Sequence, residues 1–165
     1  MYEELCKCQE LFTKFGGHPM AAGLSMEEKN VELFRRRLND NCTLTEQDLI
    51  PKIMIDVPMP ISYLSKKLTE QLKVLEPFGK GNSKPLFAQK NLRAVGIRVF
   101  GRNRNVAKML LIDENGIKMD AVYFGEAQEF VDFVQAHDTI SVTYYPEINV
   151  FQGRENLQVV IKNYC

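Results

Sequence analysis

A basic stretch that contains no acidic residue occupies residues 77–112 of the 165-residue chain. Lysine and arginine neutralise phosphates and release counterions, so such a stretch binds a polyanion without sequence preference. The net charge of zero hides this asymmetry, because residues 1–76 and 113–165 both carry more acids than bases. We therefore predict a polyanion as the partner of the stretch. Its basic residues are Lys80, Lys84, Lys90, Arg93, Arg98, Arg102, Arg104 and Lys108.

Aromatic side chains in and near this stretch offer a second kind of contact. Arg98 and Phe100 have the same parity on one expected strand, so they share a face. Tyr123 and Phe124 end a later strand, and one of the two must point outward. Exposed rings stack on bases of any sequence. The alternative is a solvated charged face above core aromatics, but solvated faces usually mix both signs of charge.

A glycine-rich run from Phe15 to Gly23 is the second candidate site. Gly16 and Gly17 let the backbone approach a ligand closely, and successive N–H groups can form an anion-binding concavity. His18 can donate a hydrogen bond to a phosphate oxygen. The alternative is a glycine pair that ends a helix, followed by an incidental histidine. Taken alone, the local pattern favours this alternative.

Residues for metal or redox chemistry are sparse. The chain has two histidines, His18 and His137, and its four cysteines lack zinc-ligand spacing and the density of a disulfide scaffold. A two-metal phosphoesterase needs several converging carboxylates and histidines, so we predict no catalytic and no metal-binding residue in this chain. No apolar run is long enough to cross a bilayer, and no signal-like amino terminus is present. We expect a cytoplasmic protein with reduced thiols and no membrane partner.

Residues 1–76 mix helical and strand patterns. Apolar residues at steps of three and four indicate helices, and glycine, proline and capping residues indicate where they begin and end. The expected elements are a helix over 5–15 ended by Gly16 and Gly17, a short buried strand over 20–26, a second helix opened by a capping-box pattern at 25–28, a strand over 53–57, and a third helix over 61–75 ended by Pro77.

Beyond a turn-rich linker at 77–86, the pattern becomes that of a β-domain. The expected elements are strands near 87–100, 106–112, 117–124, 140–144 and 157–161, with a tight turn at Asn115 and Gly116 and a helix over 126–134. Three strands, a helix and two strands is the order of a five-stranded OB barrel. Such barrels bind oligonucleotides on strands two and three and in two loops. The first loop here is 101–105, and the second, roughly 146–156, contains Phe151 and Arg154.

Several runs resemble the RecJ family of exonucleases. FGGHPMAAGLSM at 15–26 resembles the motif of the DHHA1 domain, and LEPFGKGNSKPLF at 75–87 resembles the segment that joins this domain to an OB barrel. AKMLLIDENGIKMDAVYFG and LQVVIKNY are similar to the RecJ barrel. The resemblance implies an α+β chain. Its parts are the C-terminal portion of a DHHA1 α/β domain over 1–76, a linker over 77–86 and a five-stranded OB-fold barrel over 87–165.

The resemblance also implies a function. RecJ enzymes hydrolyse single-stranded DNA from the 5′ end with divalent metal held by Asp and His clusters. It implies that Gly16, Gly17 and His18 form a loop that faces a DNA phosphate near the catalytic cleft, with Ala21, Ala22 and Gly23 packed closely beside that loop. It further implies a fragment without the catalytic DHH domain, where Mn²⁺ or Mg²⁺ is expected, so we expect no nuclease activity from this chain alone.

The barrel is expected to bind single-stranded DNA, and a helicase or a single-strand-binding protein is a further candidate partner. From charge and stacking we assign its DNA contacts to Lys80, Arg93, Arg98, Phe100, Arg102, Arg104, Lys108, Tyr123, Phe151 and Arg154. Two alternatives stay open. One is an autonomous module that binds nucleic acid or protein through the barrel. The other is part of an oligoribonuclease-like phosphoesterase with the same DHHA1 motif, against which the appended barrel argues.

Overall fold

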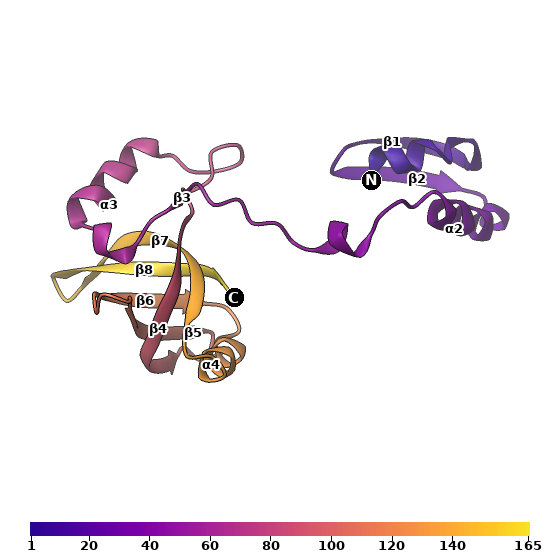
Figure 1. Ribbon diagram of the computed structural model, residues 1–165. Coiled ribbons are helices and arrows are strands. Elements are labelled where there is room, and N and C mark those ends of the chain that lie inside the picture. Colours follow the sequence, from indigo (N-terminus) through magenta and orange to yellow (C-terminus); the bar gives the residue numbers. More distant parts are fainter. The chain divides into compact units, whose positions relative to one another are not determined.

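The computed structural model describes every residue from Met1 to Cys165 and divides into two compact units, Met1–Lys52 and Ile53–Cys165 (Figure 1). None of its helices has the length and apolar character needed to cross a membrane.

The division between the units falls earlier than the expected boundary after residue 76. The reason is packing, because Ile61 and Leu64 are buried in the core of the second unit and Leu68 and Leu72 lie against that core. The expected third helix therefore buries the face that its periodicity predicts. It is broken at Ser65, whose side chain accepts a hydrogen bond from the Leu68 N–H and caps a new helix.

The first unit is built on a two-stranded antiparallel sheet. Its elements are α1 (Tyr2–Cys6), a 3-10 turn (Gln9–Leu11), β1 (Phe12–His18), β2 (Ala21–Met26), a 3-10 turn (Glu28–Asn30), α2 (Val31–Asp40) and a last 3-10 turn (Glu46–Leu49). The prediction of one helix over 5–15 was wrong beyond Cys6, because Phe12–His18 pairs with β2 instead. The strand predicted over 20–26 is confirmed, although its side chains are exposed or half-buried and not buried.

The first unit has a small core. The apolar stripe read as helical still faces this core, where Leu5, Cys8 and Leu11 are buried and Phe12 contacts the rings of Phe15 and Phe34.

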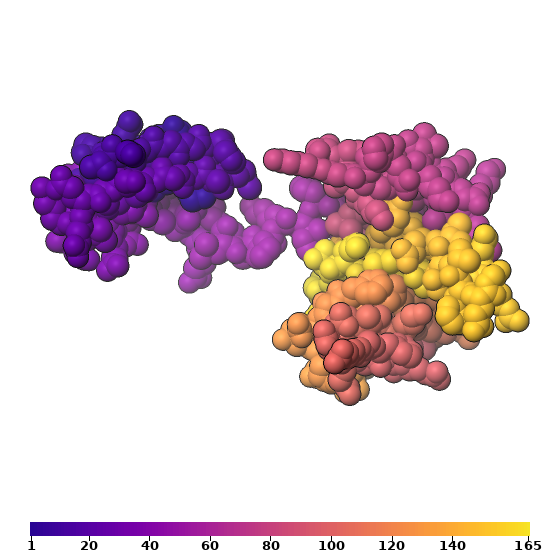
Figure 2. All heavy atoms as spheres, turned by 180° about the vertical axis from the view of Figure 1, so that it is seen from behind, coloured from indigo at the N-terminus to yellow at the C-terminus, as the bar shows by residue number.

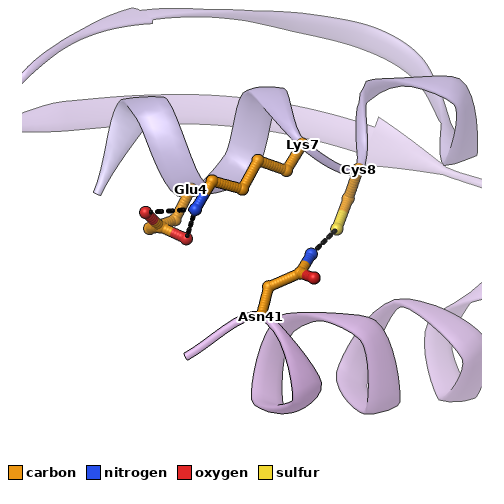
Figure 3. Close-up of polar contacts among 4 residues, drawn as sticks. All are labelled: Glu4, Lys7, Cys8 and Asn41. Atoms are coloured by element: carbon orange, nitrogen blue, oxygen red, sulfur yellow. Dashed lines mark hydrogen bonds and ion pairs between the residues drawn. The ribbon is translucent and has the colours of Figure 1, made fainter. Parts of the chain in front are cut away.

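Figure 3 shows the Asn41 side chain, directly after α2, pointing toward the Cys8 side chain. The Asn41 amide, at the end of α2, lies 4.0 Å from the Cys8 Sγ, whereas the Lys7 ammonium pairs with Glu4 at the surface, 2.7 Å away. The predicted capping box at 25–28 does not form, because Ser25 belongs to β2. The box is found at Thr45 and Asp48, and the Thr45 N–H and hydroxyl lower the pKa of the Asp48 carboxyl by donating to it.

The second unit is dominated by a sheet with the strand order β3-β4-β5-β6-β8-β7, and β4 also pairs with β7. The five strands from β4 to β8 therefore pair in a closed circuit. The elements are β3 (Val57–Pro58), a 3-10 turn (Ile61–Tyr63), α3 (Lys66–Leu72), a 3-10 turn (Lys73–Leu75), β4 (Phe87–Phe100), β5 (Val106–Ile112), β6 (Lys118–Phe124), α4 (Ala127–Gln135), β7 (Ile140–Phe151) and β8 (Arg154–Tyr164).

The strands and the helix expected after residue 86 are all present. Two details differ. The strand predicted over 53–57 is reduced to a two-residue parallel pairing of Val57 and Pro58 with β4. The expected loop over 146–156 is mostly strand, because β7 and β8 continue pairing until a turn at Gln152 and Gly153, both with positive φ. This turn projects from the rest of the second unit (Figure 1 and Figure 2).

The inward side chains of the circuit form the core, together with α4 and the 3-10 turn at Ile61. Leu92, Leu111, Phe130 and Val159 have no exposed surface. Tyr144 is equally buried, and its hydroxyl donates to the Met59 carbonyl at 2.5 Å. Burial raises the Tyr144 pKa, so the side chain stays a neutral donor.

Candidate nucleic-acid interface

The outward face of β4, β5 and β6 carries the aromatic and basic side chains of the acid-free stretch. Alternation along each strand sends Ala107 into the core and leaves Lys108 exposed. On β4 the alternation is interrupted by a bulge between Val95 and Arg98, where Gly96 has a φ of +64°. The bulge adds one residue, so Arg93 before it and Arg98 after it both face outward.

An aromatic row crosses this face. Phe100 lies opposite Val106, and Val106 lies opposite Phe124 on the next strand. The two rings keep 46% and 58% of their surface exposed, although both are large and apolar. Burying such surface is favourable, so two exposed rings in one row indicate a contact surface for an apolar ligand face.

A cationic row lies beside the aromatic row on the same face. Arg98 lies opposite Lys108, one outward position along each strand from Phe100 and Val106. Both cations are exposed, and no Asp or Glu oxygen lies within 4.0 Å of either. The same holds for all eight basic residues of the stretch. These charges are therefore available to an anionic partner, although Asp120 of β6, opposite Leu110, is exposed on the same face.

The loop at 101–105 lies directly beyond the aromatic row. Arg102 and Arg104 are exposed in it, and Arg104 has a φ of +52°. The loop is held at its end, because the Asn105 carbonyl accepts from the Gly125 N–H at 3.0 Å. The Arg104 guanidinium also donates to the Gln128 side chain of α4 at 3.4 Å. The prediction of an exposed basic loop at this position is confirmed.

Tyr123 is half-buried and packs against α4 instead of lying on the outward face, and its assignment to a DNA contact stays a prediction. Its ring stacks on Phe130 of α4, with centroids 4.8 Å apart, and meets Tyr164 edge-on. Phe124 points outward in its place. The sequence showed only that one of these two neighbours must face outward. Tyr123 is the one packed because α4 supplies a ring against which it stacks.

Lys80 lies in a different setting, next to β7. It occupies the turn from Gly79 to Asn82, whose Asn82 amide donates to the Leu75 and Pro77 carbonyls at 2.9 Å. The neighbouring Phe78 meets the Tyr145 ring of β7 edge-on, and the Lys84 ammonium lies 4.8 Å from the centre of the Tyr145 ring. The expected linker at 77–86 is thus held against the sheet. Lys80 does not share a strand or a row with Arg98.

Phe151 and Arg154 form the last cross-strand pair of the β7–β8 hairpin. Both are exposed, Phe151 to 65%, at the projecting turn described above. An ion pair between Lys66 of α3 and Glu155, at 3.3 Å, holds this end of the hairpin. The structure thus brings these two residues together, on a hairpin where a loop was expected.

The glycine–histidine run of the first unit is a strand, so the expected phosphate-facing loop is not formed. Gly16 and Gly17 pair with Gly23 and Ala22. A Cβ on Gly17 would lie 2.5 Å from the Ala22 Cα, which explains the glycine by close strand approach. His18 ends the strand, exposed, and its Nδ1 accepts from the Met20 N–H at 3.3 Å.

The side chains of this chain do not fit a divalent-metal centre. No three His, Cys, Asp or Glu side chains lie close enough together to hold an ion. His137 is turned to the backbone, with its Nδ1 2.8 Å from the Phe133 carbonyl.

Comparison with known proteins adds the following. Residues 55–163 match the RecJ OB domain family. The single-stranded-DNA-specific exonuclease RecJ of Bacillus subtilis is 31% identical over 99% of this chain and 21% of its own length. That of Escherichia coli is 30% identical over 93% of this chain and 26% of its own length. The crystal structure of RecJ in complex with Mn²⁺ from Thermus thermophilus shares the fold, with a TM-score of 0.72 and 21% identity over 99% of this chain and 23% of that one. The chain thus spans about a fifth to a quarter of these relatives.

Proposed function

This chain belongs to the RecJ OB domain family, and from that premise we propose that it binds single-stranded DNA as the DNA-holding part of a RecJ-type exonuclease. The observation that carries the proposal is the outward face of β4, β5 and β6. On it, Phe100 and Phe124 are exposed beside Arg98 and Lys108, which have no acidic partner.

The fold supports the same conclusion. We assign the circuit of β4 to β8 to the five-stranded OB barrel, because its pairing follows the order one-two-three-five-four and returns to strand one. In that barrel the face of strands two and three and the loop between strands one and two bind oligonucleotides. Lys108, Val106 and Phe124 lie on strands two and three, Arg98 and Phe100 lie beside them on strand one, and the loop at 101–105 joins strands one and two.

Arginine and lysine supply most of the affinity in this proposal. Each phosphate contact with a single strand contributes about 0.7 to the slope of log affinity against log salt. Arg93, Arg98, Lys108 and the two loop arginines therefore predict a steep salt dependence. The exposed rings add stacking, which requires unpaired bases. Single strands are expected to bind better than duplex, with little sequence preference.

In the complete enzyme, this part of the protein is proposed to bind the DNA substrate. The Bacillus subtilis and Escherichia coli relatives are exonucleases, and two crystal structures of RecJ from Thermus thermophilus are complexes with Mn²⁺ and with Mg²⁺. The residues of this chain do not fit such an ion, and we assign them no hydrolytic step. We propose that metal and hydrolysis belong to the DHH domain of the complete protein, in the cytoplasm. A helicase or a single-strand-binding protein remains a proposed partner.

The first unit is proposed to be the C-terminal portion of a DHHA1 domain. Its support is the FGGHPMAAGLSM run, now seen as a β-hairpin with His18 exposed at its turn. In the complete protein, Gly16, Gly17 and His18 are proposed to approach a DNA phosphate, with the His18 ring as donor. The family match over 55–163 does not favour a protein-binding adaptor or an oligoribonuclease-like enzyme.

The test is a binding titration at several salt concentrations. Labelled single-stranded and duplex oligonucleotides of equal length are compared by fluorescence anisotropy. We expect tighter binding of the single strand, a steep loss of affinity with salt, and no metal-dependent degradation. Equal affinity for both forms, or no binding even at low salt, would refute the proposal.

A further inference from the structure

The spacing of the two exposed rings specifies how many bases the face holds. Phe100 and Phe124 flank Val106 in one row across three adjacent strands. Neighbouring strands lie about 4.8 Å apart, so the backbone positions that carry the two rings are about 10 Å apart. One base between two parallel rings needs a separation of only about 7 Å, twice the stacking distance of about 3.4 Å. At this backbone spacing, each of the two rings has room to stack on a base of its own.

The cations show on which side the sugar–phosphate chain runs. Arg98 and Lys108 lie one outward position from Phe100 and Val106, about 6.6 Å along the strands. The next member of their row is Val122, which is buried, so the positive charge is confined to β4 and β5. On the other side, the Asn105–Gly125 hydrogen bond holds the loop at 101–105 beside the residue that follows Phe124.

From this arrangement, and resting on the proposed function, we infer that one DNA strand crosses β4, β5 and β6 with two non-adjacent bases stacked separately on Phe100 and Phe124. Its phosphates pass Arg98 and Lys108. Val106 lies under the intervening nucleotide and offers an apolar surface without a ring. Phe124 is thus a base-binding residue, and the two rings make separate contributions to one site.

A double-mutant cycle tests the separation. Phe100→Ala, Phe124→Ala and the double variant are titrated with an oligothymidylate of eight nucleotides. Each single change is expected to weaken binding about 5- to 150-fold, the range for loss of one stacked base, and the double change is expected to multiply the two effects. Phe124→Tyr, which keeps the ring, should restore the affinity, whereas Phe124→Leu should not.

The matched control is Tyr63→Ala, which removes an aromatic side chain that is 72% exposed but lies outside this face. It should leave DNA affinity unchanged. Both phenylalanines are about half exposed, so thermal unfolding of the variants should match the parent and exclude a folding defect.

Three results would distinguish a failure of DNA binding itself from a failure of the two stacking positions. No binding by the parent protein refutes the proposed function itself. Binding that persists unchanged in the double variant leaves that function standing but refutes the stacking positions. A second change that adds nothing to the first shows one shared base and overturns the inference of two.

Discussion

The two places that the sequence marks for phosphate binding, the β4–β6 face and the hairpin of Gly16 to His18, differ in what carries the site. On the face, binding is assigned to side chains, and strand pairing presents them outward in rows. In the hairpin it was assigned to a loop backbone, and the chain forms a strand there instead. A side-chain site on a strand depends mainly on alternation and on the bulges that shift it. A backbone site depends on a local conformation that two glycines permit but do not specify.

The largest loss of DNA affinity is expected when the charges of the face are removed. Arg93, Arg98 and Lys108 changed together to alanine should reduce single-stranded-DNA affinity about 100-fold at about 0.1 M salt and lower the salt slope by about two. Three phosphate contacts are lost in this variant. Fluorescence anisotropy at several salt concentrations gives both values.

The control for this variant carries the same change in net charge. Arg36, Lys52 and Lys67 are exposed, unpaired and outside the face, and changing all three to alanine should leave the slope nearly unchanged. A similar loss of affinity in both variants would mean that net charge, and not this face, binds DNA.

The hairpin is expected to respond in stability and not in DNA binding. Gly17→Ala places a Cβ 2.5 Å from the Ala21 carbonyl oxygen and the Ala22 Cα, which must move. Overpacking of this kind costs about 1 to 3 kcal/mol, and it should lower the unfolding midpoint of the first unit while leaving DNA affinity unchanged. Hydrogen exchange of the β1 and β2 amides reports the first unit by itself.

Gly16→Ala is the matched change, because no atom lies within 4 Å of the added Cβ. It should be tolerated. If both substitutions protect or destabilise the hairpin equally, close strand approach does not explain Gly17.

The two arginines of the loop at 101–105 are each expected to contribute less to DNA affinity than the three cations of the face together. Arg102→Ala and Arg104→Ala should each lower the salt slope by about 0.7 and weaken binding about fivefold at about 0.1 M salt, if each contacts one phosphate. Arg104→Ala also removes the 3.4 Å hydrogen bond to Gln128. A Gln128→Ala variant that binds DNA normally would show that the charge matters and not this hydrogen bond.

The smallest effect is expected for His18→Asn. DNA binding and unfolding of this chain should be almost unchanged, because His18 is exposed and its ring bonds only to the Met20 N–H. In the complete exonuclease the same change should slow turnover, at a cost of a few kcal/mol at most, if the ring donates to a phosphate. Unchanged turnover in a folded His18→Asn enzyme would make the residue an incidental turn residue.

Strand alternation was the feature of the sequence that predicted most. The strands from Phe87 onward could be placed because apolar and polar residues alternate over long runs, and the helix between β6 and β7 because Phe130 and Val134 lie on one apolar side of it. The prediction of one helix over residues 5–15 was wrong because apolar residues at steps of three and four also occur where a helix and a 3-10 turn are followed by a strand. Here the strand begins at Phe12, directly after Leu11. The hairpin at 146–156 was predicted as a loop, whereas Pro146 lies within β7 opposite Val159 and the two strands pair as far as Phe151 and Arg154.

The charged residues of the candidate site could be predicted from the sequence, but its second aromatic residue, Phe124, could not. Arg98, Phe100 and Lys108 follow from parity along one strand and its neighbour. Choosing between Tyr123 and Phe124 required knowing where α4 packs, which no local pattern contains. Phe151 and Arg154 were assigned as DNA contacts within one loop, and the hairpin that pairs them across its strands was not expected.

The bulge at Gly96 sets the phase of everything that follows it on β4. Outward positions are odd-numbered before it, as at Arg93, and even-numbered after it, as at Arg98 and Phe100. Were the strand paired without the bulge, Ile97 and Val99 would face outward in their place. A single residue thus decides whether this edge of the molecule is cationic and aromatic or plainly aliphatic. In an alignment of related chains, the outward-facing positions of this strand are therefore the odd-numbered residues just before Gly96 and the even-numbered residues after it.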